Sequence, residues 1–222
     1  MTGTATTPFV FTCCVELRQT LNLRALDERE LLDRMEEAPE AAILFHTYGY
    51  FLRHGPMTMA YGNDFASWVA TQLRDHVLAE RLAVVNPFEF DSLGTLREEL
   101  LTVINDHLLR LSSVPRIEFG EPFYFQQSDV VQVPLGAGVS SLAEFQSALA
   151  DVDTSALYFH MIEARARLGR RADDFSEWIR TGLGLHDLAD RIARIDAYMT
   201  SLERVRARVL GLVEQALEAE GA

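Results

Sequence analysis

Two stretches of the sequence place a histidine and an arginine seven residues apart, a spacing that suits proton transfer or anion binding. The stretch ILFHTYGYFLRHG contains His46 and Arg53, and the stretch LYFHMIEARARLG contains His160 and Arg167. In a helix this spacing puts both side chains on one face, about 10 Å apart. Histidine titrates near neutral pH, and arginine binds anions. The structural alternative is a buried, hydrogen-bonded histidine with an arginine that stabilises the carboxyl end of the helix.

Other polar side chains near the histidines extend these two candidate sites. Tyr50 and His54 share the helical face of His46, and Glu163 lies close to His160 in the second stretch. These neighbours differ between the two stretches, whereas the histidine and the arginine recur. We therefore expect any difference in function between the two sites to arise from these neighbours.

A second repeated motif, Asp-Phe-x-x-Trp, follows each histidine. It places Asp64 and Trp68 after the first histidine, and Asp174 and Trp178 after the second. Aspartate at the start of a helix usually caps it, so we expect both aspartates to be N-caps. We expect both tryptophans to pack in the core. The functional alternative puts the tryptophan and Asn63, or Asp173 in the second copy, at the mouth of a cleft that faces His46 or His160. Aromatic faces with carboxylates would suit a sugar, among other ligands.

These patterns give one set of candidate ligand-binding residues and assign no catalytic residue. The set is His46, Tyr50, Arg53, His54, Asn63, Asp64, Trp68, His160, Glu163, Arg167, Asp174 and Trp178. We expect no metal site, because the pairs His76–Glu80 and His186–Asp190 lack further ligands. We also expect no cofactor. The chain has no lysine, which excludes Schiff-base chemistry with pyridoxal phosphate and the lysine of a P-loop.

The composition limits the class of partner. A net charge of −13 disfavours nucleic acid, because phosphate backbones are bound by excess positive charge. No apolar run approaches the roughly 18 residues of a membrane span, and the first residues lack the pattern of a signal peptide. We therefore expect a cytoplasmic protein that binds a small molecule or a protein partner, with no membrane or nucleic-acid partner. It could also form a homo-oligomer.

The motifs recur at nearly constant spacing, which predicts an internal duplication. The sequences Phe-Val-Phe and Phe-Tyr-Phe begin at residues 9 and 123, and this spacing of 114 also separates the two histidines. The two Asp-Phe-x-x-Trp motifs are 110 residues apart, so the second copy has a loop four residues shorter. We predict repeat 1 at 9–110, a connector at 111–122 and repeat 2 at 123–217, packed as one globular unit.

Each predicted repeat contains one or two strands followed by four to five helices. Aromatic and β-branched residues predict strands at the start of each copy. Asp27 and Ser140 or Ser141 are expected N-caps of the helices that follow. Apolar residues at helical spacing predict an amphipathic last helix that includes Leu96 and Leu100. The predicted fold is α+β and mostly α, with pseudo-twofold symmetry and a small antiparallel sheet.

The order of these motifs resembles the prokaryotic family numbered fifty-seven fifty-two among the domains of unknown function. The resemblance rests on the Phe-x-Phe strand, the Phe-His segment, Asn-Asp-Phe-x-x-Trp and Ala-Glu-Arg-Leu, and it extends from Phe9 to about Leu217. It implies the duplicated architecture. It carries over no catalytic residue, and it links the chain only loosely to carbohydrate metabolism.

Three functions fit these observations. The leading hypothesis is a ligand-binding or partner-binding regulatory module with a link to carbohydrate metabolism, because no catalytic motif was found. The alternative is a cofactor-independent enzyme that uses histidine and carboxylate acid–base chemistry on a sugar or a phosphate ester. The third is an interaction protein whose repeats form a helical docking surface.

Overall fold

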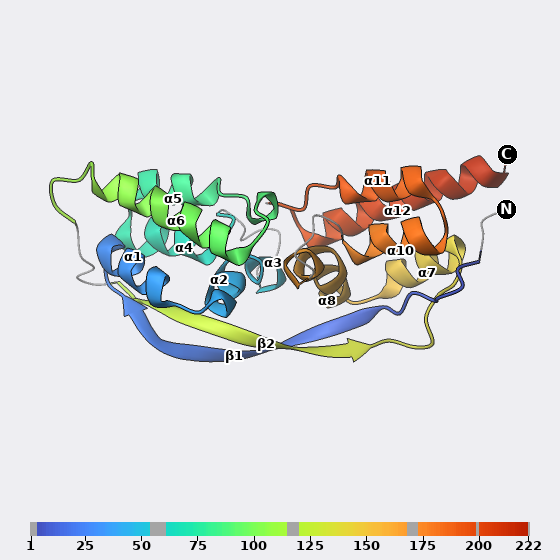
Figure 1. The fold of residues 1–222 in the computed structure, drawn as a ribbon, viewed down its shortest axis with the longest axis horizontal. Coiled ribbons are helices and arrows are strands. Elements are labelled where there is room, and N and C mark those ends of the chain that lie inside the picture. The colour runs from blue at the N-terminus through green and yellow to red at the C-terminus, as the bar shows by residue number, and fades with distance from the viewer. Residues whose placement is uncertain (1–3, 54–60, 115–119, 168–172, 199, 222) are drawn as a thin grey trace. The chain divides into compact units, whose positions relative to one another are not determined.

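The computed structural model describes residues 4–53, 61–114, 120–167, 173–198 and 200–221 (Figure 1). It shows a mostly helical α+β protein with one two-stranded antiparallel sheet, as predicted. The chain divides into two compact units. The central unit is Glu16–Asp129, and the terminal unit combines Met1–Val15 with Val130–Ala222. Among the helices of the described ranges, none is long and apolar enough to cross a membrane.

The two strands, β1 (Thr12–Ala25) and β2 (Phe123–Pro134), each contribute to both units. Within the central unit, the side chains of Gln127 and Gln19 are hydrogen-bonded across the sheet at 3.0 Å. Within the terminal unit, the N–H of Leu135 donates to the carbonyl of Phe11 at 2.7 Å. Each unit therefore contains one end of the paired ribbon.

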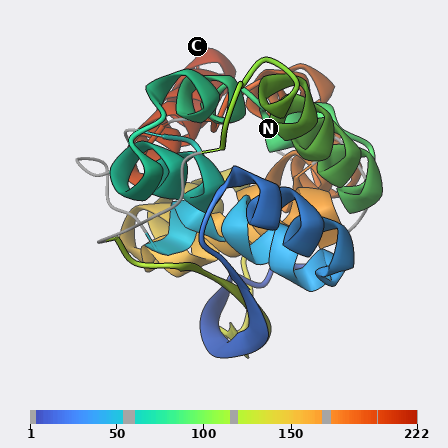
Figure 2. The same ribbon diagram turned by 90° about the vertical axis from the view of Figure 1, so that its left-hand side faces the viewer.

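The central unit covers its end of the ribbon with helices. Figure 2 looks onto this unit and shows β1 bending towards the first helix. The helices are α1 (Glu28–Glu37), α2 (Glu40–His46), α3 (Tyr50–Arg53), α4 (Asp64–Trp68), α5 (His76–Ala83) and α6 (Leu93–Leu108), with a π-helical turn at Val69–Leu73 and a 3₁₀ turn at Pro87–Glu89. Asp27 caps α1 by accepting the N–H of Glu30 at 2.8 Å, as predicted. The predicted apolar face of α6 is buried, and α6 packs on α1.

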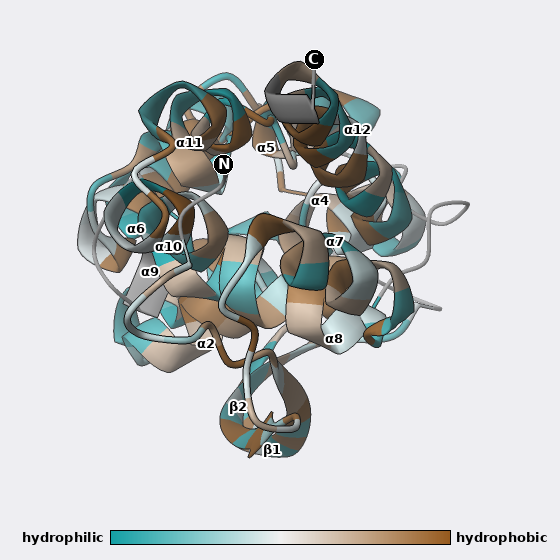
Figure 3. Cartoon of the chain, turned by 90° about the vertical axis from the view of Figure 1, so that its right-hand side faces the viewer, coloured by the Kyte–Doolittle hydropathy of each residue, from teal (hydrophilic) through white to brown (hydrophobic). Residues whose placement is uncertain are grey.

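The terminal unit is also mostly helical, with its π-helical segment at a different place in the order of elements. Its helices are α7 (Leu142–Asp151), α8 (Thr154–Leu157), a π-helical segment at Tyr158–Glu163, α9 (Ala164–Arg167), α10 (Asp174–Gly182), α11 (His186–Ala193) and α12 (Leu202–Gly221). Ser141 and Glu144 form a capping box at the start of α7, which decides between the two predicted serines. Figure 3 shows both hydrophobic and hydrophilic residues on α12, and its buried residues include Val205 and Val209.

The histidine segment of the central unit departs from the predicted helix. A continuous helix through His46 and Arg53 was expected, but α2 ends at His46 and α3 begins at Tyr50. A Cβ atom on Gly49 would lie 2.6 Å from the backbone carbonyl oxygen of Phe45, so only glycine allows this close approach. In the terminal unit the helical path continues from α8 to α9 through the π-helical segment.

The aromatic strand residues of each predicted repeat pack on helices of the other repeat. Phe9 belongs to the terminal unit, where its ring centroid lies 5.5 Å from that of Phe175. Phe123 belongs to the central unit, where its ring centroid lies 5.2 Å from that of Phe65. Each structural unit therefore contains the aromatic segment that the sequence analysis assigned to the other repeat. The duplication itself stays a prediction.

Candidate functional site

His46 connects three elements of the central unit. It is almost fully buried, and its Nδ1 lies 2.8 Å from Oδ2 of Asp64, the first residue of α4. Its Nε2 accepts the backbone N–H of Gln126, on β2, at 2.9 Å. A backbone N–H can only donate, so Nε2 carries the lone pair and Nδ1 carries the proton given to Asp64. The imidazole is therefore a neutral link from α2 to α4 and β2.

His160 makes the same set of bonds in the terminal unit. Its Nδ1 lies 2.9 Å from Oδ2 of Asp174, and its Nε2 accepts the N–H of Thr12 at 2.9 Å. Thr12 and Gln126 are 114 positions apart, the same spacing that separates the two histidines. The two clusters therefore have the same hydrogen-bonded frame, and each lies within its own unit.

The capping role predicted for the two aspartates was wrong. Asn63 and Asp173, one residue earlier, are the N-caps, and they accept the N–H groups of Ala66 and Ser176 at 2.9 and 2.8 Å. This releases Asp64 and Asp174 to hold the histidines. Asn63 does not lie at a cleft mouth either, because it is 2% exposed and donates to the carbonyl of Leu82 at 2.9 Å.

The two tryptophans are buried, and each indole hydrogen-bonds to the backbone of the segment that precedes a strand. Trp68 Nε1 donates to the carbonyl of Glu121 at 2.8 Å, and Trp178 Nε1 donates to the carbonyl of Thr7 at 3.0 Å. Thr7 and Glu121 are again 114 positions apart. Each indole therefore fixes the entry of a strand into its unit.

Arg53 and His46 are brought together by a shared carboxylate. A nitrogen of the Arg53 guanidinium pairs with Oδ2 of Asp64, the same atom that accepts from the histidine. Arg53 Nη1 lies 3.8 Å from Oε1 of Glu16, and its Cζ lies 3.8 Å above the ring centroid of Phe45. The sequence analysis predicted the pair of His46 and Arg53, but it missed Glu16 and Phe45 as further partners of Arg53.

Of the four remaining candidate residues, the structure describes the side chains of two, and both are buried. Tyr50 is buried, with a hydroxyl whose pKa is raised mainly by burial. Glu163 is also buried, at 8% exposed. His54 and the side chain of Arg167 lie outside the described residues. Because Tyr50 and Glu163 are both buried, neither supplies an open catalytic group.

Burial decides the charge state of the central cluster. Desolvation is the largest effect on the pKa of His46, which is lowered, and the Asp64 carboxylate only partly opposes it. Burial also raises the pKa of Glu16, opposed by the nearby guanidinium groups of Arg53 and Arg18. His46 is therefore neutral at pH 7, in agreement with its hydrogen bonds.

Both histidines therefore act as connectors. Each uses one ring nitrogen as a donor and the other as an acceptor inside the fold, which leaves no nitrogen facing a substrate. A general base needs a free lone pair within reach of a substrate proton. Within the described residues, no group of three or more histidine, cysteine, aspartate or glutamate side chains has the arrangement to hold a metal.

A pocket of about 530 Å³ opens beside the terminal cluster. Its lining residues are Thr6, Thr7, Phe9, Asp174, Glu177, Trp178, Thr181 and Gly182. Two of them, Asp174 and Trp178, were candidates from the sequence. The threonines were missed because they belong to no repeated motif, and only the fold brings residues 6 and 7 to α10.

The fold and these clusters define a class of two-unit, mostly helical proteins whose strands are held by a buried histidine in each unit. The chain belongs to the family described as Family of unknown function (DUF5752), which it matches over residues 6–214. This confirms the resemblance inferred from the motifs. A solved structure described as the structure of OrfY from Thermoproteus tenax is similar, with a TM-score of 0.80 and 27% identity over 96% of this chain and 97% of that chain. No curated protein matches the sequence.

Proposed function

We propose that the protein is a non-catalytic module that binds a small, neutral, hydroxyl-rich molecule such as a sugar. The observation that carries this proposal is the lining of the pocket beside α10. Among the described residues, it combines three threonine hydroxyls, two carboxylates and two aromatic rings, with no cationic side chain. The ligand would lie against Trp178 and Phe9 and hydrogen-bond to Glu177.

The chemistry of this lining favours a sugar over an anion. Carboxylates accept hydrogen bonds from ligand hydroxyl groups, and threonine hydroxyls both donate and accept. Aromatic side chains cover the apolar faces of ligands in pockets of this kind. Glu177 would repel a phosphate or a carboxylate, and none of the described residues that line the pocket is cationic.

Gly182 contributes to the shape of this pocket. A Cβ atom there would lie 3.0 Å from Trp178 Nε1 and 3.3 Å from the Cβ of Ala5. Glycine therefore leaves the edge of the indole uncovered at the end of α10. The position 110 residues earlier holds Gln72, whose Oε1 accepts the N–H of Glu121 at 2.8 Å. In the central unit, the Gln72 side chain at the corresponding position therefore binds the backbone just before β2.

The hydrogen bonds of His160 support a binding role over a catalytic one. The histidine is linked to Asp174, which lines the pocket, but its own nitrogens are held by Asp174 and by the N–H of Thr12. Proton transfer to a ligand would require one of these bonds to break. Acid–base chemistry on a sugar therefore finds no support in this geometry.

Titration calorimetry with glucose, maltose and sucrose tests the proposal. We expect binding of at least one sugar, loss of most of that affinity in Glu177→Gln, and an increase in melting temperature with sugar concentration. Glu214→Gln, a change of the same type on an exposed residue of α12, should bind as the wild type does. Absence of binding by all three sugars, or equal weakening in both variants, would overturn the sugar site. Conversion of the sugar, followed by proton NMR, would overturn the non-catalytic role.

A further inference from the structure

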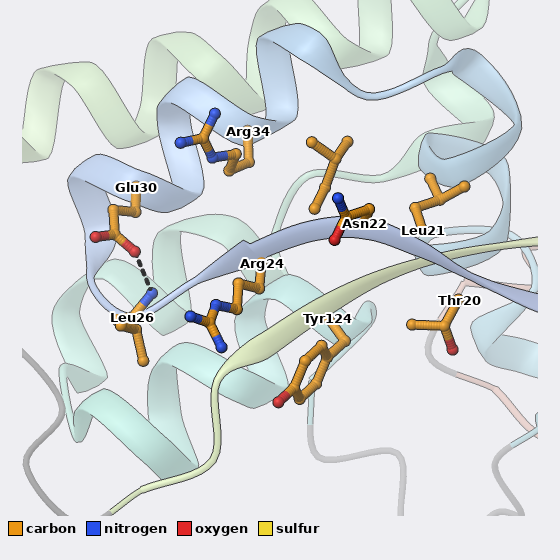
Figure 4. A pocket seen from close by; sticks show the side chains of 9 residues that line it. Thr20, Leu21, Asn22, Arg24, Leu26, Glu30, Arg34 and Tyr124 are labelled. Atoms are coloured by element: carbon orange, nitrogen blue, oxygen red, sulfur yellow. Dashed lines mark hydrogen bonds between the residues drawn. The ribbon is translucent and has the colours of Figure 1, made fainter.

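A second pocket, of about 720 Å³, lies in the central unit and has the opposite chemical character (Figure 4). It is lined by residues of β1, α1 and β2: Thr20, Leu21, Asn22, Leu23, Arg24, Leu26, Glu30, Arg34 and Tyr124. Its volume falls within the range of about 300–1,000 Å³ that is usual for small-molecule sites. It contains none of the residues proposed above for the sugar, so the two proposals are independent.

Two arginines from different elements line this pocket. Arg34 comes from α1 and Arg24 from β1 (Figure 4). Arg34 Nη1 pairs with Oε2 of Glu37 at 2.8 Å, which leaves its other donors. Within the described part of the chain, Arg24 has no ion pair or side-chain hydrogen bond. In a chain of net charge −13, a pocket with two guanidinium groups is a specific place for an anion.

The carboxylate in the pocket has a structural role. Glu30 Oε2 accepts the N–H of Leu26 at 3.0 Å, which closes the turn between β1 and α1 (Figure 4). The same bond occurs 114 positions later, where Glu144 Oε2 accepts the N–H of Ser140 at 2.8 Å. The turn is therefore built in the same way in both units.

The side chains that give the pocket its chemistry do not recur with that turn. The positions 114 residues from Asn22, Arg24, Arg34 and Tyr124 hold Gly136, Gly138, Ala148 and Val10. The turn thus forms without either arginine, without the amide and without the phenol. These four side chains are therefore not needed to build the turn and are available to a ligand.

We propose that this pocket binds a phosphomonoester, with the phosphate paired to Arg24 and Arg34. Guanidinium groups bind phosphate through paired, charge-assisted hydrogen bonds. Tyr124, 44% exposed, offers a ring face and a hydroxyl to the organic part of the ligand, and Asn22 offers an amide. The site therefore takes a small ligand with a phosphate at one end and a polar body.

Calorimetric titration with phenyl phosphate, glycerol 1-phosphate and inorganic phosphate tests this site, with acetate as the comparison anion. We expect the phosphate esters to bind more tightly than acetate. Arg24→Gln and Arg34→Gln should each weaken binding about tenfold, as expected for the loss of one charge-assisted pair. Arg29→Gln is the matched control, because Arg29 is exposed on α1 and does not line the pocket.

Circular dichroism melts of all three variants establish that they fold. With folded variants, unchanged affinity in Arg24→Gln and Arg34→Gln would overturn the proposal, as would equal weakening in Arg29→Gln. Failure of all three phosphates to bind the wild type would do the same. Acetate binding as tightly as the esters would overturn the assignment to phosphate.

Discussion

The central and terminal units use the same histidine frame but bury different charges around it. In the central unit, Arg53 lies between the carboxylates of Asp64 and Glu16. The position 114 residues after Glu16 is Val130, so the terminal unit has no carboxylate there. The terminal unit instead has a buried carboxylate at Asp173, the cap of α10. Its Oδ2 lies 3.8 Å from Arg165 Nη2.

This difference shows which parts of the cluster the fold requires. The bonds from histidine to aspartate and to the strand N–H recur in both units and build the frame. The cap of the helix works with the neutral Asn63 in one unit and with Asp173 in the other, although burial raises the pKa of Asp173. The extra buried charges belong to one unit each, so their loss should affect that unit alone.

The largest effect is expected where the two units agree. His46→Ala and His160→Ala each leave a strand N–H and an aspartate without a partner, and each also opens a cavity. We expect each to lower the free energy of unfolding of its unit by about 3–5 kcal/mol, measured by urea denaturation. His76→Ala, on an exposed residue, should cost little. A cost below about 1 kcal/mol for either buried histidine would contradict the connector role.

The second-largest effect is expected from Arg53, whose carboxylate partner Glu16 has no counterpart in the terminal unit. Arg53→Ala removes the guanidinium group that lies between Asp64 and Glu16, and should cost about 3 kcal/mol although Arg18 stays 3.5 Å from Glu16. In a Glu16→Val background, which installs the residue of the terminal unit, the same change should cost about 1 kcal/mol less. Urea denaturation of the four proteins of this cycle gives the coupling. Additive costs would show that Glu16 and Arg53 do not interact.

A pH effect of intermediate size should come from Glu28, which is fully buried in the central unit where the terminal unit has Leu142. Burial is the main cause that raises its pKa to about 6 from 4.5, with a smaller contribution from the charge of Asp75. The folded state therefore holds a proton that the unfolded state has lost. Stability should fall as pH rises from about 4.5 to about 6, by about 2 kcal/mol in total.

Glu28→Gln keeps the shape of this side chain and removes its titration. We expect the variant to be more stable than the wild type at pH 7.5 and to lose that advantage at pH 4.5, measured by urea denaturation at both values. Glu36→Gln, on an exposed residue of the same helix, is the control. Parallel curves for Glu28→Gln and the wild type would exclude a role for Glu28.

The smallest effect should again be equal in the two units. Asp27→Ala and Ser141→Ala remove the N-caps of α1 and α7, which stand 114 positions apart. Each should cost about 1 kcal/mol of unfolding free energy, because one backbone N–H in the first turn loses its acceptor. Thermal melts of both variants test this equality. A cost confined to one variant would mean that the two helices depend differently on their caps.

The sequence predicted the elements better than the contacts of their side chains. The family followed from the order of motifs along the chain. The mostly helical fold, the cap at Asp27 and a cap at Ser140 or Ser141 followed from local patterns, because each depends on residues within a few positions. The role of Asp64 could not be read in this way. Asn63 and Asp64 are both good cap residues, and a shift of one position decides which of them faces the histidine.

The chain's own order of residues thus determined the repeated motifs, their spacing and the apolar faces of its helices. Only the tertiary structure decided which helices each strand packs on, and it placed Thr12 beside His160 and Gln126 beside His46. The physical reason is that periodicity reports which face of an element avoids water, whereas the partner of that face depends on long-range packing. The pocket residues Arg24 and Arg34 illustrate this limit, since no motif joins them and the turn from β1 to α1 does.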